Sequence, residues 1–216
     1  MPVSVKICGI NSAEAAEAVL RMGADFGGLV FFEKSPRHLG LEAGRTLAER
    51  MRGRLKLVAL VVDADNDRLS RIAEEVRPDF FQLHGRETPA RAAEIRTRFQ
   101  ISLIKALPAG EPSDLGRARD YEMAEMLLFD APVAEDASRP GGHGMAFDWQ
   151  MLKGASIGKP WFLAGGLNPQ NVGRAIETSG ARMVDVSSGV ESAPGVKSGA
   201  LISDFIAAAR TRAAVA

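Results

Sequence analysis

Short β-prone runs alternate with stretches of helical spacing along the whole 216-residue chain, at intervals of roughly 25 residues. We expect eight strands, at residues 3–8, 26–31, 56–62, 80–84, 102–107, 126–130, 161–164 and 183–187. Helical spacing is found at residues 12–22, 41–51, 65–76, 88–99, 113–121, 147–152, 169–178 and 199–214. Regular strand–helix alternation indicates parallel strands joined by right-handed crossovers. Eight units predict an α/β fold in which residues 1–216 form one single-domain (β/α)8 TIM barrel; an open doubly wound sheet, which usually has fewer strands, is the alternative.

Capping residues precede three of the predicted helices. Ser12, Thr88 and Asn168 carry side-chain oxygens that can accept a backbone N–H of the first turn. Pro89 and Pro169 follow two of them, where the missing N–H of proline costs nothing. The longest irregular segment, residues 131–146, is a loop of a length that is typically functional or mobile.

The charge balance argues against a polyanionic or membrane partner. Lys and Arg together number 27, as do Asp and Glu, so the formal net charge is zero. The apolar runs are too short to span a bilayer. One cysteine and no export signal fit a reducing compartment, so we expect a cytoplasmic protein that acts on a small molecule as a monomer or homodimer.

Cys8, the single cysteine, ends the first predicted strand directly before Gly9. A free thiol is most often a small buried hydrophobe. A thiol at a strand tip can instead face a substrate and act as a base or nucleophile. Position alone favours the buried, inert thiol.

Strand parity turns polar side chains toward the barrel axis. Side chains alternate between the two faces of a strand, and the apolar residues of each strand are expected to face the helices. The residues that then face inward, from the first, fourth, sixth and eighth strands, are Lys6, Cys8, Gln82, His84, Asp130, Asp185 and Ser187. In the fifth strand Ile104 and Lys105 take opposite faces, and an inward Lys105 makes five contributing strands. A buried Lys6–Asp185 ion pair is expected because the first and eighth strands are neighbours. It does not account for Cys8, His84 and Asp130, so the sequence predicts an active site at the C-terminal mouth.

Glycine-bearing turns follow the last two strands, where barrels of this type often bind phosphate through backbone N–H groups. They contain Gly165 and Gly166, and Ser188 and Gly189; Gly142 and Gly144, after the sixth strand, are further candidates. His38, His84 and His143 lack metal-ligand spacing, and the chain has no P-loop, nucleophile elbow or zincin motif. We expect neither a metal nor a cofactor.

At this point the sequence resembles the phosphoribosylanthranilate isomerases, (β/α)8 enzymes of tryptophan biosynthesis. The resemblance runs nearly end to end and is carried by Lys6–Ile10, Gly23–Phe31, Lys34–Arg37, Gln82–Gly85, Ile104–Ala106, Leu127–Asp130, Gly141–Gly144, Phe147–Trp149, Gly165–Val172, Asp185–Glu191 and Pro194–Lys197. The departures from the family pattern are Asn11, Phe129, His143 and Ser198, and none is a catalytic position.

The resemblance implies an Amadori rearrangement of N-(5-phosphoribosyl)anthranilate to an aminoketone. It implies that Asp130 is the acid that protonates the ring oxygen and Cys8 the base that removes the proton at sugar C2. Arg37 resembles the ligand of the anthranilate carboxylate; without the resemblance it reads as a solvated loop arginine. Lys6 and His84 are further expected substrate contacts, and Asp185 either contacts the anthranilate amine or neutralises Lys6.

The two catalytic roles make opposite electrostatic demands. Asp130 must keep its proton in a desolvated setting, whereas Cys8 must lose one, so we expect its pKa to fall, with help from Lys6. Two other functions stay open. A histidine-pathway phosphosugar isomerase uses two aspartates, and Cys8 argues against it; a catalytically silent phosphate-ligand binder is the other.

Overall fold

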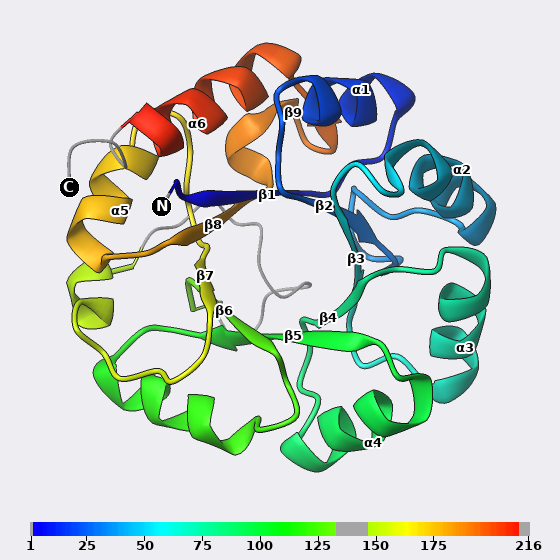
Figure 1. The fold of residues 1–216 in the computed structure, drawn as a ribbon, viewed down its shortest axis with the longest axis horizontal. Coiled ribbons are helices and arrows are strands. Elements are labelled where there is room, and N and C mark those ends of the chain that lie inside the picture. The colour runs from blue at the N-terminus through cyan, green and yellow to red at the C-terminus, as the bar shows by residue number, and fades with distance from the viewer. Residues whose placement is uncertain (1, 133–146, 212–216) are drawn as a thin grey trace.

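Eight parallel strands close into a barrel in the computed structural model, which describes residues 2–132 and 147–211. The strands follow one another around the barrel in chain order, and β8 pairs with β1 to close it (Figure 1). Their bounds are β1 (Ser4–Cys8), β2 (Phe26–Val30), β3 (Lys56–Val61), β4 (Phe80–Leu83), β5 (Ser102–Pro108), β6 (Met126–Asp130), β7 (Trp161–Leu163) and β8 (Met183–Val186). The predicted (β/α)8 barrel is confirmed, and each predicted strand agrees with the structure to within one residue at either end.

The connecting helices form an outer ring around the barrel (Figure 1). They are α1 (Ala13–Arg21), α2 (Leu41–Met51), α3 (Asn66–Glu75), α4 (Pro89–Phe99), α5 (Val172–Ser179) and α6 (Gly199–Thr211), with the 3-10 helices η1 (Pro112–Asp120), η2 (Trp149–Leu152) and η3 (Ser188–Val190). An antiparallel hairpin of β9 (Glu191–Ala193) and β10 (Val196–Lys197), which the sequence did not predict, follows η3.

Two of the three predicted helix caps are confirmed. Ser12 accepts the N–H of Ala15 at 3.1 Å, and Thr88 accepts that of Arg91 at 3.2 Å with Pro89 in the first turn. The third prediction is wrong, because α5 begins at Val172 and not at Pro169. The side chains of Asn168 and Asn171 accept N–H groups within residues 168–171, which holds this segment as a turn ahead of the helix.

The predicted helices at residues 113–121 and 147–152 are 3-10 helices in the structure. In η1 the Glu111 and Asp114 side chains form a capping box, but Gly116 lies in the middle and weakens a regular α-helix. In η2 the Asp148 side chain accepts the N–H of Gln150, and four residues are too few for a full α-helix.

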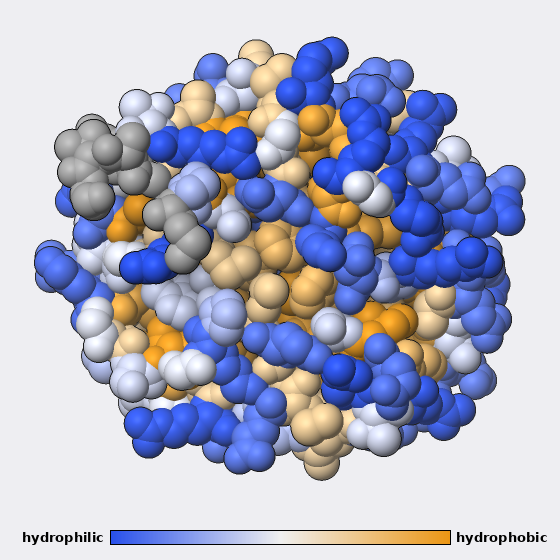
Figure 2. All heavy atoms as spheres, in the orientation of Figure 1, coloured by the Kyte–Doolittle hydropathy of each residue, from blue (hydrophilic) through white to orange (hydrophobic). Residues whose placement is uncertain are grey.

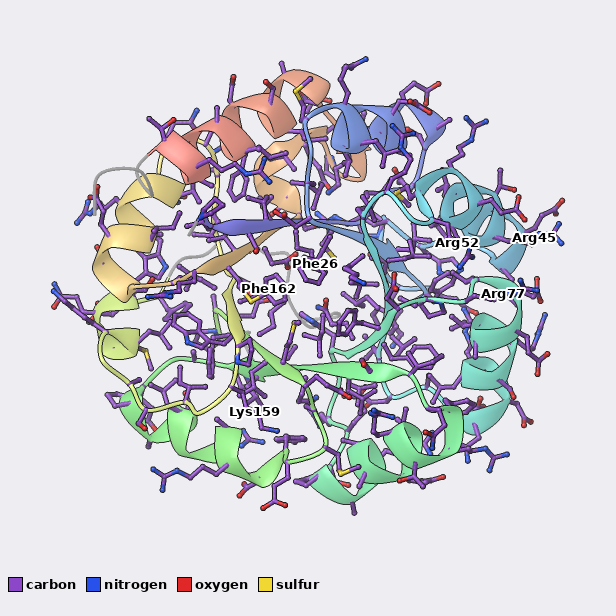
Figure 3. The ribbon with its side chains drawn as sticks, viewed as in Figure 1. Phe26, Arg45, Arg52, Arg77, Lys159 and Phe162 are labelled. Atoms are coloured by element: carbon purple, nitrogen blue, oxygen red, sulfur yellow. The ribbon has the colours of Figure 1, made fainter. Side chains whose placement is uncertain are left out.

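Apolar side chains fill the N-terminal half of the barrel interior. Phe26 and Phe162 point inward (Figure 3) and meet edge to face with ring centroids 5.2 Å apart, packed with Val58, Ile104 and Leu128. A larger apolar layer lies between the strands and the helices. Charged and polar residues gather over the outer ring of helices on the face that Figure 2 shows. Among the described residues, no helix has the length and apolar character needed to cross a membrane.

Candidate active site

Polar side chains from four strands lie inside the C-terminal half of the barrel, as parity predicted for β1, β4, β6 and β8. Lys6 and Gln82 are completely buried, and Asp185 is nearly so. Lys6 and Asp185 are register partners on β1 and β8, and Nζ lies 2.8 Å from Oδ1, so the predicted ion pair is confirmed. Burial alone lowers the pKa of Lys6, but Asp185 and then Cys8 outweigh it and raise that pKa above its ordinary value.

The prediction that a fifth strand contributes, through an inward Lys105, is wrong. Ile104 and Ala106 belong to the barrel interior, and Leu103 and Leu107 to the layer beneath the helices. Lys105 shares the face of Leu103 and Leu107 and therefore lies on the helix side of β5. It is tolerated there because its ammonium is 2.7 Å from the Glu87 carboxylate.

Cys8 is 4% exposed and packs with Val30 and Leu60. Gly28 lies beside it on β2: a Cβ there would be 3.1 Å from Cys8 Sγ and 3.3 Å from Lys6 Nζ, so any larger residue would press on both groups. Burial raises the pKa of the Cys8 thiol above its ordinary value, although the Lys6 ammonium opposes it. The expected fall in this pKa is therefore wrong, because desolvation outweighs the nearby cations.

Lys197 is a second buried cation near Cys8, and sequence reasoning did not single it out. Its Nζ donates to the carbonyl of Ser187 at 2.9 Å and to Glu191 Oε1 at 2.7 Å. The Ser187 hydroxyl in turn donates to the carbonyl of Cys8 at 3.0 Å. The β9–β10 hairpin therefore brings a positive charge to the end of β1, and this charge lowers the pKa of the thiol.

Asp130 and His84 meet at the ends of β6 and β4. His84 Nε2 lies 3.4 Å from Asp130 Oδ2, and Asp130 Oδ1 accepts the N–H of Ala131 at 2.9 Å. The other ring nitrogen of His84 lies 2.9 Å from Gln82 Nε2, which comes from the same face of β4. The imidazole is thus held between a buried amide and the carboxyl group that the sequence predicted as the acid.

Arg37, in the loop after β2, is buried and not a solvated loop arginine. Its Nε and Nη2 donate to the two carboxylate oxygens of Glu191 at 2.7 and 2.8 Å. Burial on its own raises the pKa of Glu191, but the hydrogen bonds from Arg37 and the charge of Lys197 lower it to about 2. Glu191 is the second residue that sequence reasoning missed. The motif containing it gave no spacing clue to a partner 154 residues away.

The two glycine-bearing turns lie side by side at the mouth. A Cβ on Gly189 would collide with the carbonyl oxygen of Leu167, so this glycine lets the turn after β8 pack on the turn after β7. Gly165 and Gly166 both have positive φ. The N–H groups of residues 165–167 donate to no acceptor in the part of the chain that the structure describes. The first N–H groups of η3, from Ser188, also lack intrahelical acceptors.

These N–H groups, which have no partner among the described residues, suit an anion such as a phosphate. Gly142 and Gly144, the other predicted phosphate contacts, lie with His143 outside the described residues.

This combination suits acid–base chemistry on a phosphorylated small molecule. A thiol near two ammonium groups can accept a proton, and a carboxyl group on another strand can donate one. The paired turns after β7 and β8 supply an anion site at the same mouth.

Comparison with known proteins agrees with this chemistry. Residues 5–208 match the family model of N-(5'phosphoribosyl)anthranilate (PRA) isomerase. The N-(5'-phosphoribosyl)anthranilate isomerase of Rhodopseudomonas palustris strain BisA53 is 50% identical over 211 residues, which cover 97% of each chain. That of Parvibaculum lavamentivorans is 46% identical over 213 residues, which cover 97% of this chain and 99% of the relative.

Solved structures give the same result. Phosphoribosyl anthranilate isomerase from Thermotoga maritima superposes with a TM-score of 0.86 at 34% identity, covering 96% of this chain and 98% of that chain. Another phosphoribosyl anthranilate isomerase was solved in complex with reduced 1-(o-carboxyphenylamino)-1-deoxyribulose 5-phosphate. It superposes with a TM-score of 0.81 at 32% identity, with the same coverage of both chains. Sequence and fold agree over almost the whole chain, which therefore belongs to the N-(5'-phosphoribosyl)anthranilate isomerase family.

Proposed function

We propose that Cys8 is the general base and Asp130 the general acid of the reaction of this family. That reaction is the isomerisation of N-(5'-phosphoribosyl)anthranilate to 1-(2-carboxyphenylamino)-1-deoxyribulose 5-phosphate in tryptophan biosynthesis. The assignment rests on the positions of the two residues in the barrel. Cys8 is the last residue of β1 and Asp130 the last residue of β6, and both face the inside of the C-terminal mouth.

The two residues act in sequence. Asp130 gives its proton to the ring oxygen of the sugar as the C1–O bond breaks, and the anthranilate nitrogen forms a Schiff base with C1. The Cys8 thiolate then removes the proton from C2, the electron pair of that C–H bond forms the C1–C2 double bond, and the π pair of the C1–N double bond moves to nitrogen. Tautomerisation of the resulting enolamine yields the aminoketone, so the reaction is an isomerisation and needs no cofactor.

The raised pKa of Cys8 is compatible with a base that acts only when substrate is present. Burial favours the protonated thiol, and Lys6 and Lys197 stabilise the thiolate when it forms. Lys6 is completely buried, so we assign it to this electrostatic support. Asp185 neutralises Lys6 and keeps 7% of its surface exposed, and we assign it the contact with the substrate amine as well.

The remaining contacts follow from charge. We assign the anthranilate carboxylate to Arg37, whose guanidinium Glu191 holds in a fixed orientation. His84 orients Asp130 and contacts the sugar. The N–H groups at Gly165, Gly166, Ser188 and Gly189 bind the phosphate, joined by Gly142 and Gly144.

We further propose that residues 1–216 form one catalytic domain that works in the cytoplasm, in keeping with the lone free cysteine. The expected assembly is a monomer or a homodimer. A solved relative from Thermotoga maritima is a dimeric isomerase, and its structure is that of generated monomers.

The direct test of the activity is to mix the purified protein with freshly formed N-(5'-phosphoribosyl)anthranilate and follow its fluorescence. The expected result is a decrease whose rate is proportional to protein concentration. A decrease that is the same with and without protein contradicts the proposed function.

A further inference from the structure

A buried ion pair lies behind the site, on the helix side of the barrel wall. Lys105 on β5 and Glu87, just before α4, are each only 2% exposed in their side chains, with Nζ 2.7 Å from Oε2. Desolvating two charges is costly, and an apolar pair of similar volume often stabilises a fold as well. The acid–base chemistry at the mouth does not use either residue.

The partners of this pair are concentrated in one short segment of backbone. Lys105 Nζ donates to the carbonyl of Leu83 at 3.2 Å and to that of Gly85 at 2.8 Å. The Glu87 carboxylate accepts the N–H of Gly85, with the shorter distance 3.0 Å, and the N–H of Asp63 at 2.9 Å. The residue between the two carbonyls that Lys105 binds is His84.

Tyr121 and Asp63 make further hydrogen bonds to the same backbone segment. The Tyr121 hydroxyl donates to the carbonyl of Glu87 at 3.0 Å, and its ring lies beneath the Lys105 ammonium with 5.7 Å between Nζ and the centroid. Asp63 Oδ1 accepts the N–H of Arg86 at 2.7 Å. The N–H of His84 itself donates to the carbonyl of Val61. Each of the five residues from Leu83 to Glu87 therefore has at least one backbone group in a hydrogen bond.

We propose that the Lys105–Glu87 pair is a positioning device for His84. It fixes the backbone on both sides of this residue so that the imidazole stays against Asp130, across the 3.4 Å gap between Nε2 and Oδ2. The inference rests on the proposed role of Asp130 as the acid. A misplacement of catalytic groups by about 1 Å can lower the rate 10²-fold. A rigid support behind His84 therefore benefits catalysis even though burying its two charges is unfavourable.

The test compares Lys105→Met with Glu125→Gln. Lys105→Met keeps the aliphatic stem and removes the ammonium. Glu125 is the control, because it pairs with a cation, Arg96, and accepts the N–H of Leu103 at 2.6 Å, so it contacts β5 at the N-terminal end of the strand, away from the mouth. Both variants are studied as full-length protein below their unfolding transitions, which circular dichroism defines.

The first readout is independent of activity. Imidazole signals of the three histidines are recorded by ¹H–¹⁵N NMR and assigned with His84→Ala. The expected result is that the His84 signals shift in Lys105→Met and stay unchanged in Glu125→Gln. Unchanged His84 signals in Lys105→Met overturn the proposal, whatever the kinetics show.

The second readout is kinetic. Lys105→Met is expected to lower kcat by roughly 10- to 100-fold with a much smaller change in KM, and to have little further effect in a His84→Ala background, because both changes disable the same group. The proposal is overturned if the loss of kcat in the double variant equals the product of the two single losses. It is also overturned if folded Lys105→Met keeps the kcat of the wild-type protein. If Lys105→Met does not fold, Tyr121→Phe replaces it, with a smaller loss expected in the same direction.

Failure of the acid assignment is separable from failure of this inference. If Asp130→Asn retains full turnover, the role of Asp130 is wrong. The shift of the His84 signals still decides whether Lys105 positions that ring.

Discussion

At the scale of single residues, Cys8 shows what a linear pattern can and cannot reveal. The alternation of side chains along the first strand predicted that the thiol faces the inside of the mouth, and in the structure it packs there with Val30 and Leu60. The expected fall in its pKa was wrong, because the largest cause of the shift is the burial of Cys8, and the sequence does not show how completely the thiol is withdrawn from water. Lys197 comes from the far end of the chain, and no local spacing predicts its approach.

The pH dependence of catalysis should report the raised pKa of Cys8. We expect kcat/KM of the free enzyme to increase with pH up to and beyond 9.0, the ordinary value for this thiol, because the base is the thiolate. Lys197→Met should move this limb to higher pH, since the Lys197 charge lowers the pKa. Lys153→Met, which removes an exposed lysine, serves as the control and should leave the profile unchanged. A profile already flat from neutral pH upward contradicts the assignment.

Gly28→Ala tests the space around the thiol. The added Cβ would lie 3.1 Å from Cys8 Sγ and 3.3 Å from Lys6 Nζ, so one of the two groups must move. We expect kcat to fall by about tenfold or more, the scale of a small misplacement of a catalytic group. Gly116→Ala is the control, because a Cβ there meets nothing within 4 Å. Equal rates for the two variants in steady-state assays would refute the role of Gly28.

At the scale of elements, the strands were predictable and the connections less so. Both faces of a barrel strand are buried, so β5 carries apolar residues on each side and parity could not tell which face held Lys105. Ser12 and Thr88 cap helices as their sequence context predicted. The start of α5 was misplaced because Asn168 bonds to neighbouring N–H groups within a turn, a choice that asparagine offers equally well.

The β9–β10 hairpin should confer acid-sensitive stability through Glu191. Its pKa is lowered from 4.5 to about 2 in the folded chain, so the stabilisation is complete above the unfolded value and is lost as the pH falls toward 2. Glu191→Gln should therefore lower stability at neutral pH and flatten its decline between 4.5 and 2. Urea unfolding at a series of pH values measures this. An identical pH slope for the wild-type protein and the variant would contradict the hairpin's role.

At the scale of the whole molecule, the barrel divides into two halves with different tasks. The N-terminal half of the interior is apolar, and the C-terminal half holds the ionisable groups. The alternation of elements alone was enough to predict this architecture, because few folds accommodate eight strand–helix units. The pairing of distant charges, such as Arg37 with Glu191, needed the folded chain, since a loop and a hairpin at opposite ends of the sequence meet only after the barrel closes.

Phe162→Ala tests the apolar half. The ring is completely buried in the barrel interior and packs edge to face on Phe26, so its removal leaves a cavity. We expect the free energy of unfolding to fall by about 3–5 kcal/mol, as measured by urea denaturation. A loss below about 1 kcal/mol would mean that the interior collapses around the missing ring and does not act as a rigid packed core.

The assignment of base and acid is tested most directly by Cys8→Ala and Asp130→Asn, assayed on N-(5'-phosphoribosyl)anthranilate. Binding of reduced 1-(o-carboxyphenylamino)-1-deoxyribulose 5-phosphate is measured in parallel by calorimetry. We predict that each variant loses turnover by about 10²- to 10⁴-fold or more, while the affinity for the product analogue stays close to that of the wild-type protein. An unchanged rate in either variant, with binding intact, would contradict the role given to that residue.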